Sequence, residues 1–413
     1  MRLLLGAFGE PGHAFPAIAL GRVLAARGHE VTLQTWRRWE HHVVAEGMAF
    51  AAAPEDPVFP TPDHPLNPYE VALPLTRMTV PLVEAVAPDA VVADVLTLAP
   101  ALAGELCGVR VATLIPHVHP ALPRGMPPYS AGARRPRTPL GRALWRAPAR
   151  LMERGLRLGR DDLNRLRAAL GLAPVDRLWG GLSQELCLVG TFPQLEYPRE
   201  WPPGTEVVGP LLWEPPAGVG VEPPAGEGPV VLVAPSTSQD PDGLLVRNAL
   251  DGLAAMSVRV LAVTGGRPLR GDVPADARVV EWLSYARTMP RCDLVVCHAG
   301  HGTLARALAS GCAVVAVPAG GDMAENAARI DWAGVGVRVP RRLCTPRSIA
   351  LAVGRALARP GMRSRAGELA AWAAEHDGAE RAADAVERFA LDGRREVAGL
   401  PGPGSGGPGN LAR

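Results

Sequence analysis

The sequence contains no lysine. All 43 of its basic residues are arginine, and 41 acidic residues leave a formal net charge of only +2. A chain so close to neutrality has no bulk electrostatic attraction for nucleic acid, so we expect no nucleic-acid partner. The absence of lysine also excludes the phosphate-binding loop GxxxxGK[ST], whose lysine contacts the phosphates.

Cysteine and long apolar runs are scarce as well. Six cysteines are spread over 413 residues, and none forms a CxxC pair. This spacing disfavours a zinc framework, and a long chain with few cysteines is typical of a reducing compartment. No apolar run approaches the roughly 20 residues that span a bilayer, and the N-terminal MRLLLGAFGEPGH is too short for a signal peptide. We therefore expect a cytoplasmic protein.

Short apolar runs alternate with helical patterns in two series, and the length allows two domains. The first series occupies residues 3–5, 31–33, 90–93, 111–115 and 186–189. The second occupies residues 230–234, 258–263, 278–282, 294–296, 313–317 and 335–339. Strands that alternate with helices predict parallel sheets, so the expected fold class is α/β with two such domains.

The segment 206–229 is rich in proline and glycine and predicts a linker. It separates an N-terminal domain at 1–205 from a C-terminal domain at 230–394, whose last helix could pack back on the first domain. The tail at 395–413 ends in GLPGPGSGGPGNLAR, has no apolar face and is expected to be disordered.

Residues 124–167 hold twelve arginines against Glu153, Asp161 and Asp162. Two interpretations are open. The segment is either a solvated helical face, as charge runs usually are, or a contact surface for anionic lipid or an anionic substrate.

The stretch CHAGHGT at 297–303 lies between an apolar run and a helical pattern. It therefore forms the turn from the carboxyl end of a strand into a helix, where ligands bind in open parallel sheets. It is either a diphosphate site on the free N–H groups of the helix, an ordinary turn, or a metal site of Cys297, His298 and His301. The metal site is disfavoured, because three ligands in one tight turn cannot all point at one ion.

His13 follows the first apolar run in GEPGHAFPA. It either caps a helix or acts as a general base, because an imidazole with a pKa of about 6.5 can take a proton from a hydroxyl group. Asp94 follows the run at 90–93 and would lie at the same edge of the sheet. A carboxylate bonded to the far imidazole nitrogen fixes the tautomer and stabilises the imidazolium, so the two residues predict a base and its partner.

Three further patterns carry weaker signals. Trp282, at the end of the run 278–282, is either a core residue or a flat surface for a nucleobase. The DxD pattern at 240–242 matches the metal-binding motif of some sugar transferases, but its proline and the glycine that follows it predict a turn. GAFGEPG at 6–12 is GxxGxxG rather than GxGxxG, which disfavours a dinucleotide dehydrogenase.

Taken in order, these motifs resemble the family 1 glycosyltransferases of GT-B fold, especially the bacterial branch that glycosylates natural products. The similarity covers nearly the whole chain and is strongest at 279–339, with HxGxGT at 298–303 and the pattern P-x3-D-x3-N of Pro318, Asp322 and Asn326. PGHxxPAIALGRVLAARGHEVT at 11–32 and VVGPLL at 207–212 agree with it. The resemblance implies two Rossmann-like parallel-sheet domains that face each other across a cleft.

The resemblance also implies a division of roles. The C-terminal domain would bind a dTDP- or UDP-sugar donor, and the N-terminal domain would bind the acceptor. Trp282 would stack on the nucleobase, and the backbone of Leu283 would bond its edge. The diphosphate would be held by Ser236, Thr237, His298, Gly300, Gly302 and Thr303. Asp322 would bond sugar hydroxyls, and His13 with Asp94 would be the base and its partner.

Position 323 is methionine, where glucose-using members of the family have glutamine. A thioether cannot donate hydrogen bonds to hydroxyls, so a donor with fewer hydroxyls, such as a deoxysugar, is expected. The expected function is an inverting hexosyltransferase of natural-product or antibiotic biosynthesis that acts on a hydroxyl of a hydrophobic small molecule such as a polyketide. It would use no metal and no cofactor besides the donor.

Three alternatives stay open: a glycolipid-forming transferase at the membrane surface, a nucleotide-sugar epimerase, and a non-catalytic helper of the same fold. The acceptor pocket is expected from the loops after residue 54, at 117–135 and at 140–160, which contain His117, His119, Pro120 and Trp145. The protein is expected to act as a monomer or a homodimer.

Overall fold

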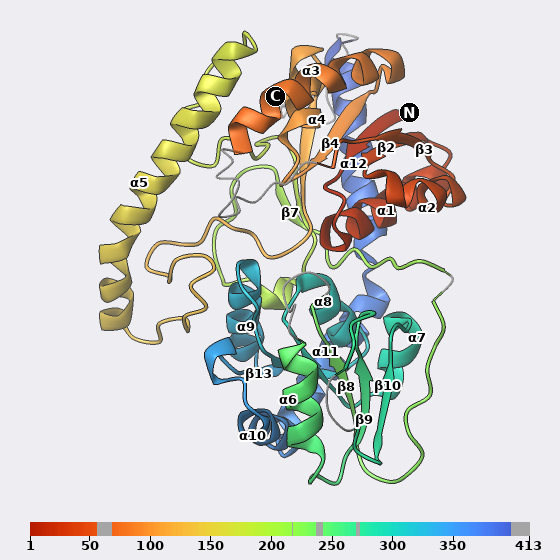
Figure 1. Cartoon of the computed structure of the whole chain (residues 1–413). Helices are drawn as coiled ribbons and strands as arrows, with labels where there is room; N and C mark the ends of the chain where they lie inside the picture. The colour runs from red at the N-terminus through yellow and green to blue at the C-terminus, as the bar shows by residue number, and fades with distance from the viewer. Residues whose placement is uncertain (56–67, 217, 237–242, 270–272, 398–413) are drawn as a thin grey trace, which may run out of the picture.

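The computed structural model describes residues 1–55, 68–216, 218–236, 243–269 and 273–397. It contains two parallel β-sheets flanked by helices, which confirms the predicted α/β class (Figure 1). Thr237 and the DxD pattern at 240–242 lie outside the described residues. No helix in the described part of the chain is long and apolar enough to cross a bilayer.

The N-terminal sheet has seven parallel strands in the order β3-β2-β1-β4-β5-β6-β7. The strands are β1 (Arg2–Gly6), β2 (Glu30–Thr35), β3 (Ala49–Ala52), β4 (Ala90–Asp94), β5 (Val111–Ile115), β6 (Cys187–Val189) and β7 (Thr205–Val207). The helices are α1 (Pro11–Ala26), α2 (Glu40–Ala45), α3 (Pro68–Val86), α4 (Leu98–Leu106) and α5 (Pro139–Ala169). Successive leucines in β1 are all buried, because helices cover both faces of a parallel sheet.

The C-terminal sheet has six parallel strands in the order β10-β9-β8-β11-β12-β13. The strands are β8 (Val230–Ala234), β9 (Arg259–Val263), β10 (Ala277–Val280), β11 (Leu294–Cys297), β12 (Ala313–Ala316) and β13 (Gly336–Arg338). The helices are α6 (Leu244–Leu253), α7 (Tyr285–Thr288), α8 (His301–Ala309), α9 (Asp322–Ala333), α10 (Pro346–Leu357) and α11 (Pro360–Glu375). Strand β7 includes residues 206 and 207, so the irregular chain between the sheets begins two residues later than the sequence predicts.

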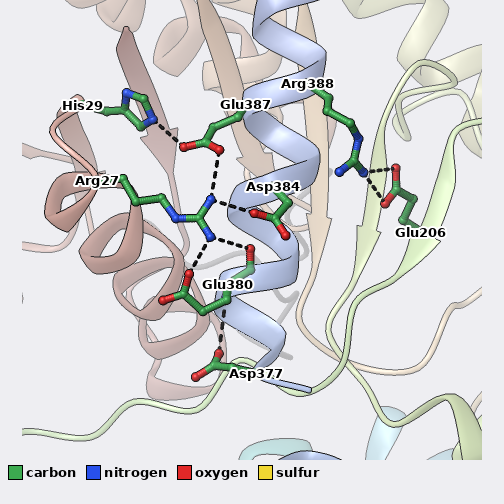
Figure 2. Close-up of polar contacts among 8 residues, drawn as sticks. All are labelled: Arg27, His29, Glu206, Asp377, Glu380, Asp384, Glu387 and Arg388. Carbon is green, nitrogen blue, oxygen red and sulfur yellow. Dashed lines mark hydrogen bonds and ion pairs between the residues drawn. The ribbon is translucent and has the colours of Figure 1, made fainter. Parts of the chain in front are cut away.

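The last helix, α12 (Gly378–Val397), returns to the N-terminal sheet. Its apolar side, including Val386 and Phe389, belongs to the same core as Leu3 and Leu20. The acidic side chains on its polar side contact Arg27, the residue that follows α1, as Figure 2 shows. Arg27 contacts Glu380, Asp384 and Glu387. Both the charged and the apolar face of α12 thus contact the N-terminal domain. The helix extends to Val397, so residues 395–397, predicted as tail, are part of it.

Each sheet has one point at which its strand order reverses direction. In the N-terminal sheet it lies between β1 and β4, and in the C-terminal sheet between β8 and β11. The chain leaves these neighbouring strands toward opposite faces, which opens a crevice at their carboxyl ends. The residues just after β1, β4, β8 and β11 are therefore the first candidates for a site.

A buried arginine joins the two domains. Arg329 on α9 has no exposed surface, and its Nε lies 2.7 Å from Glu325 Oε1. Its Nη1 donates to Glu196 Oε2 at 3.1 Å and to the carbonyl of Leu195 at 3.0 Å, both in the N-terminal half of the chain. The guanidinium also stacks on the ring of Tyr197, 3.6 Å from its centroid. Helix α9 is thus fixed to the segment that follows β6.

We predict that Arg329→Met lowers the free energy of unfolding by about 3–5 kcal/mol, because it leaves two buried carboxylates without their cation. The matched control is Arg388→Met, which removes an exposed pair between α12 and Glu206 and should cost at most about 1 kcal/mol. Urea denaturation of both variants measures the difference. Equal losses would show that Arg329 does not hold the domains together.

Candidate active site

His13 and Asp94 meet where the strand order of the N-terminal sheet reverses. His13 lies in the first turn of α1, after β1, and Asp94 is the last residue of β4. His13 Nδ1 lies 2.8 Å from Asp94 Oδ1. The other carboxylate oxygen, Oδ2, accepts from the backbone N–H groups of Phe8 at 3.5 Å and Leu96 at 3.3 Å. The carboxylate is thereby fixed, and it orients the imidazole with Nδ1 toward Asp94, which leaves Nε2 for other partners.

The surroundings of His13 favour its protonated form. Burial alone would lower the pKa of this imidazole, but the charge and hydrogen bond of Asp94 outweigh burial and raise the pKa above its ordinary value of 6.5. Asp322, from the C-terminal domain, acts in the same direction, so the two domains meet at His13. An imidazole that accepts a proton readily and is held by a buried carboxylate is suited to general-base chemistry.

The loop between β11 and α8 has a constrained backbone. Ala299 has φ of 66°, in the left-handed region that residues other than glycine rarely adopt. The ring of His298 covers Gly300, because a Cβ built at residue 300 would lie 2.2 Å from His298 Nε2. His298 Nδ1 lies 3.4 Å from the carbonyl of Ala234, at the end of β8. The loop thus spans the reversal point of the C-terminal sheet.

Helix α8 presents its N-terminus at the same place. His301, Gly302 and Thr303 form its first turn, whose N–H groups have no partner within the helix. A Cβ built at Gly302 would meet no atom within 4 Å. This combination of free N–H groups, helix dipole and open backbone is the usual anion site of α/β proteins.

His301, which the sequence analysis considered only as a disfavoured metal ligand, connects the two domains. Its Nε2 lies 3.2 Å from the carbonyl of Gly190, just after β6, and burial lowers its pKa to about 4. Cys297 lies in the core, and burial raises the pKa of its thiol to about 12. The three residues considered as metal ligands therefore point to different partners. Among the described residues, no three His, Cys, Asp or Glu side chains gather as a metal site.

Further candidate residues follow the carboxyl ends of β8, β9 and β10. Ser236 is buried after β8, and its carbonyl accepts from Arg267 Nη1 at 2.8 Å. The sequence analysis did not single out Arg267, which follows Thr264 and two glycines after the end of β9. Trp282 is 62% exposed and lies over the Gly265–Gly266 turn, so the core interpretation was wrong. Strand β10 ends at Val280, which leaves the indole beyond the sheet, with Leu283 half-buried behind it.

Asp322 begins α9 and lies close enough to His13 for its charge to raise the pKa of that imidazole. Asn326, one turn later, donates from Nδ2 to Asp322 Oδ2 at 3.3 Å and to the carbonyl of Ala299 at 3.1 Å. The amide therefore ties α9 to the strained loop before α8. Met323 is mostly buried and packs in the C-terminal core, with 9% of its surface exposed.

A second histidine stands beside the first. His117 follows β5, and its ring centroid is 6.2 Å from that of His13. Its Nδ1 donates to the carbonyl of Val118 at 2.8 Å, with the Tyr129 hydroxyl 3.4 Å away. Burial lowers the pKa of His117 below 6.5, although the charge of Asp322 acts in the opposite direction. His117 is therefore neutral with its proton on Nδ1, and Nε2 is a hydrogen-bond acceptor.

An apolar cavity adjoins His13. Its walls come from the chain after β1, β2, β3 and β4 and from α3 and α4: Ala7, Phe8, Gln34, Trp36, Ala53, Pro54, Val71, Ala72, Leu75, Thr79, Leu96, Thr97, Leu98, Ala99 and Pro100. The Phe8 ring packs edge-on against His13 and Trp36. Pro54 is the last residue of this wall before the part of the predicted loop that lies outside the described residues. The predicted loops at 117–135 and 140–160 do not line this cavity, so His117, His119, Pro120 and Trp145 are not part of it. His119 is instead buried, and its N–H donates to Glu196 at 2.6 Å.

Comparisons with known proteins agree with this arrangement. Residues 247–387 match the family "Erythromycin biosynthesis protein CIII-like, C-terminal domain". The chain is 30% identical to O-mycaminosyltylonolide 6-deoxyallosyltransferase of Streptomyces fradiae over 97% of this chain and 100% of that protein. It is 28% identical to 4'-demethylrebeccamycin synthase of Lentzea aerocolonigenes, over 94% of this chain and 99% of the relative.

Solved structures share the whole architecture. The calicheamicin glycosyltransferase CalG4 superposes with a TM-score of 0.72 at 22% identity, over 94% of this chain and 98% of that chain. The glycosyltransferase VinC, solved in complex with dTDP, gives a TM-score of 0.68 at 18% identity, over 95% of this chain and 100% of that chain. The predicted GT-B fold is thus confirmed. The chain belongs to the family 1 glycosyltransferases of GT-B fold, in the bacterial branch that glycosylates natural products, and it is a glycosyltransferase.

Proposed function

We propose that this glycosyltransferase moves a deoxysugar, with inversion, from a dTDP- or UDP-sugar to a hydroxyl of a hydrophobic small molecule such as a polyketide. The observation that carries the proposal is the hydrogen bond between His13 and Asp94, placed opposite Asp322 and the N-terminus of α8. A base on one domain and an anion site on the other are what a single displacement requires.

In the proposed reaction, His13 acts through Nε2, because Nδ1 is engaged by Asp94. Nε2 removes the proton of the acceptor hydroxyl while the oxygen forms a bond to the anomeric carbon. The bond from that carbon to the diphosphate breaks on the opposite face, which inverts the configuration. Asp94 stabilises the imidazolium that results.

The leaving diphosphate would be held by fixed dipoles rather than by a metal. The N–H groups of Gly302 and Thr303 point out of α8, and His298 and Gly300 border them. Arg267 and Ser236 would approach from the other side of the reversal point. Such preorganised donors stabilise developing negative charge without reorganisation during the reaction. Thr237 would belong to the same group by sequence.

The nucleobase would stack on the exposed face of Trp282, with the backbone of Leu283 at its edge. Asp322 would bond sugar hydroxyls. Met323 offers no hydrogen-bond donor, which favours a sugar with fewer hydroxyls than glucose. The 30%-identical relative, a 6-deoxyallosyltransferase, supports this choice of donor class.

The acceptor would occupy the apolar cavity beside Phe8 and Trp36, with its reactive hydroxyl at His13. Gln34 and Thr79, joined by a 3.3 Å hydrogen bond, are polar points within that wall. His117 would accept a hydrogen bond from a second hydroxyl, of either substrate, through its unprotonated Nε2. Such a cavity selects a flat or branched apolar molecule with few polar groups.

We predict that His13→Ala lowers kcat about 10²- to 10⁴-fold, the usual contribution of a general base, and leaves donor affinity unchanged. His298→Ala should raise the donor Kd about tenfold, the worth of one hydrogen bond to a charged group. Turnover with a nucleotide-sugar panel and titration calorimetry with dTDP and UDP separate the two effects. Undiminished turnover in His13→Ala would refute the base assignment.

The pH profile provides a second test. Neutral His13 is the active form, so kcat/KM should rise as pH increases through a pKa above 6.5. In Asp94→Asn the charge that raises the pKa of His13 is gone and burial dominates, so the rise of kcat/KM with pH should move to lower pH. The plateau should fall by about 10²- to 10⁴-fold, because the tautomer is no longer fixed. Asp161→Asn, on the exposed part of α5, is the control. If the rise of kcat/KM in Asp94→Asn stayed at the same pH, the proposed pairing of His13 with Asp94 would be contradicted.

We predict that Gly302→Ala raises the donor Kd about tenfold or more, because its methyl group would stand where the diphosphate approaches α8. The fold itself leaves room for that methyl group, so the thermal unfolding midpoint should not fall. Gly361→Ala, at the same position of α11 and equally uncrowded, is the matched control and should change neither quantity. Unchanged donor affinity in Gly302→Ala would exclude a diphosphate at this helix.

A further inference from the structure

Helix α5 is long, peripheral and hardly buried. Its 31 residues extend about 46 Å at 1.5 Å per residue. Its buried side chains are Leu163, Leu166 and Arg167, all in the last seven residues. These two leucines pack with Ala72 of α3 and Leu102 of α4. Figure 1 shows the rest of the helix running along the edge of the molecule, apart from both sheets.

The exposed part of α5 carries a row of leucines. Leu140, Leu144, Leu151 and Leu158 are 71%, 67%, 74% and 60% exposed. At 100° per residue they fall within an arc of about 40° on the helix surface. Helices of globular proteins gain most of their stability by burying such a face, yet no described residue buries these four.

Arginines flank this leucine row on the side away from the protein. The exposed arginines of α5 are Arg142, Arg146, Arg150, Arg154, Arg157 and Arg165. The acidic residues of the helix pair with arginines of its second half, as Glu153 does with Arg157. Within the described structure, the first four arginines form no ion pair. The N-terminal half of α5 is therefore both apolar and strongly basic.

We propose that this face of α5 binds the surface of an anionic lipid bilayer, with the leucine row among the acyl chains and the arginines at the phosphate groups. A helix with an exposed row of leucines flanked by arginines has the composition of interfacial amphipathic helices. A second copy of this chain is a poorer partner, because pairing the leucine rows would bring the arginines of both helices together.

The acceptor cavity adjoins the C-terminal end of α5, where the helix that would dock on the bilayer is anchored to the protein. Ala72 both lines that cavity and packs in the cluster that anchors α5. If the proposed acceptor site is right, an apolar acceptor that partitions into the membrane would meet the enzyme there. The lipid contact itself rests only on α5 and stands or falls independently of the acceptor.

The test is cosedimentation of the full-length protein with vesicles of phosphatidylglycerol and, separately, of phosphatidylcholine. We expect binding to phosphatidylglycerol that is at least about tenfold tighter and is weakened by salt. Leu144→Gln/Leu151→Gln and Arg146→Gln/Arg150→Gln should each weaken it by about tenfold or more. The matched control is Leu351→Gln/Arg355→Gln on α10, which alters an equally exposed leucine and arginine and should bind like the parent protein.

Circular dichroism and transfer to a water-soluble acceptor without vesicles verify that the α5 variants fold and retain activity. Equal affinity for the two lipids, or α5 variants that bind like the parent, would overturn the proposal. So would light scattering that shows a dimer which Leu144→Gln/Leu151→Gln dissociates, because the face would then be an interface between copies.

Discussion

The hydrogen bond between His13 and Asp94 joins residues 81 positions apart, and strand order makes it possible. β1 and β4 are neighbours in the N-terminal sheet, and the chain leaves them toward opposite faces. The first turn of α1 and the last residue of β4 therefore meet at the edge of the sheet. The C-terminal sheet repeats this geometry at β8 and β11, which brings His298 to the carbonyl of Ala234. Each half of the site thus follows from a reversal of strand order.

The two halves are useful only if they face each other, and buried polar contacts maintain that arrangement. His301 bonds the carbonyl after β6, and Arg329 reaches Glu196 in the same region. Both come from helices, α8 and α9, whose first turns form the proposed donor side of the site. The residues that would hold the diphosphate and the sugar are therefore anchored to the domain that carries the proposed base. A shift of α8 or α9 relative to His13 would break charged or buried bonds.

The sequence predicts most of the sheet strands, because continuous apolar runs in parallel sheets are conspicuous. It also predicts the pairing of His13 with Asp94 and the turn before α8, since all of these lie at or soon after the carboxyl ends of strands. β3 is missed, because its residues AFAA lack β-branched side chains. Neither the contact of His301 with Gly190 nor the cavity built from four strand ends could be predicted, because both depend on how distant segments pack. Trp282 was ambiguous until the end of β10 was known.

Helix α12 makes the order of synthesis differ from the order of assembly. The core of the N-terminal domain includes Ala382, Val386 and Phe389, which are among the last described residues of the chain. Domains generally fold in the order of their synthesis. Here the surface of α1 that α12 covers stays exposed until the whole C-terminal domain has been made, because α12 follows that domain in the chain. The N-terminal domain is thus synthesised first but completed last. A chain truncated before Gly378 would lack the part of the N-terminal core that α12 supplies.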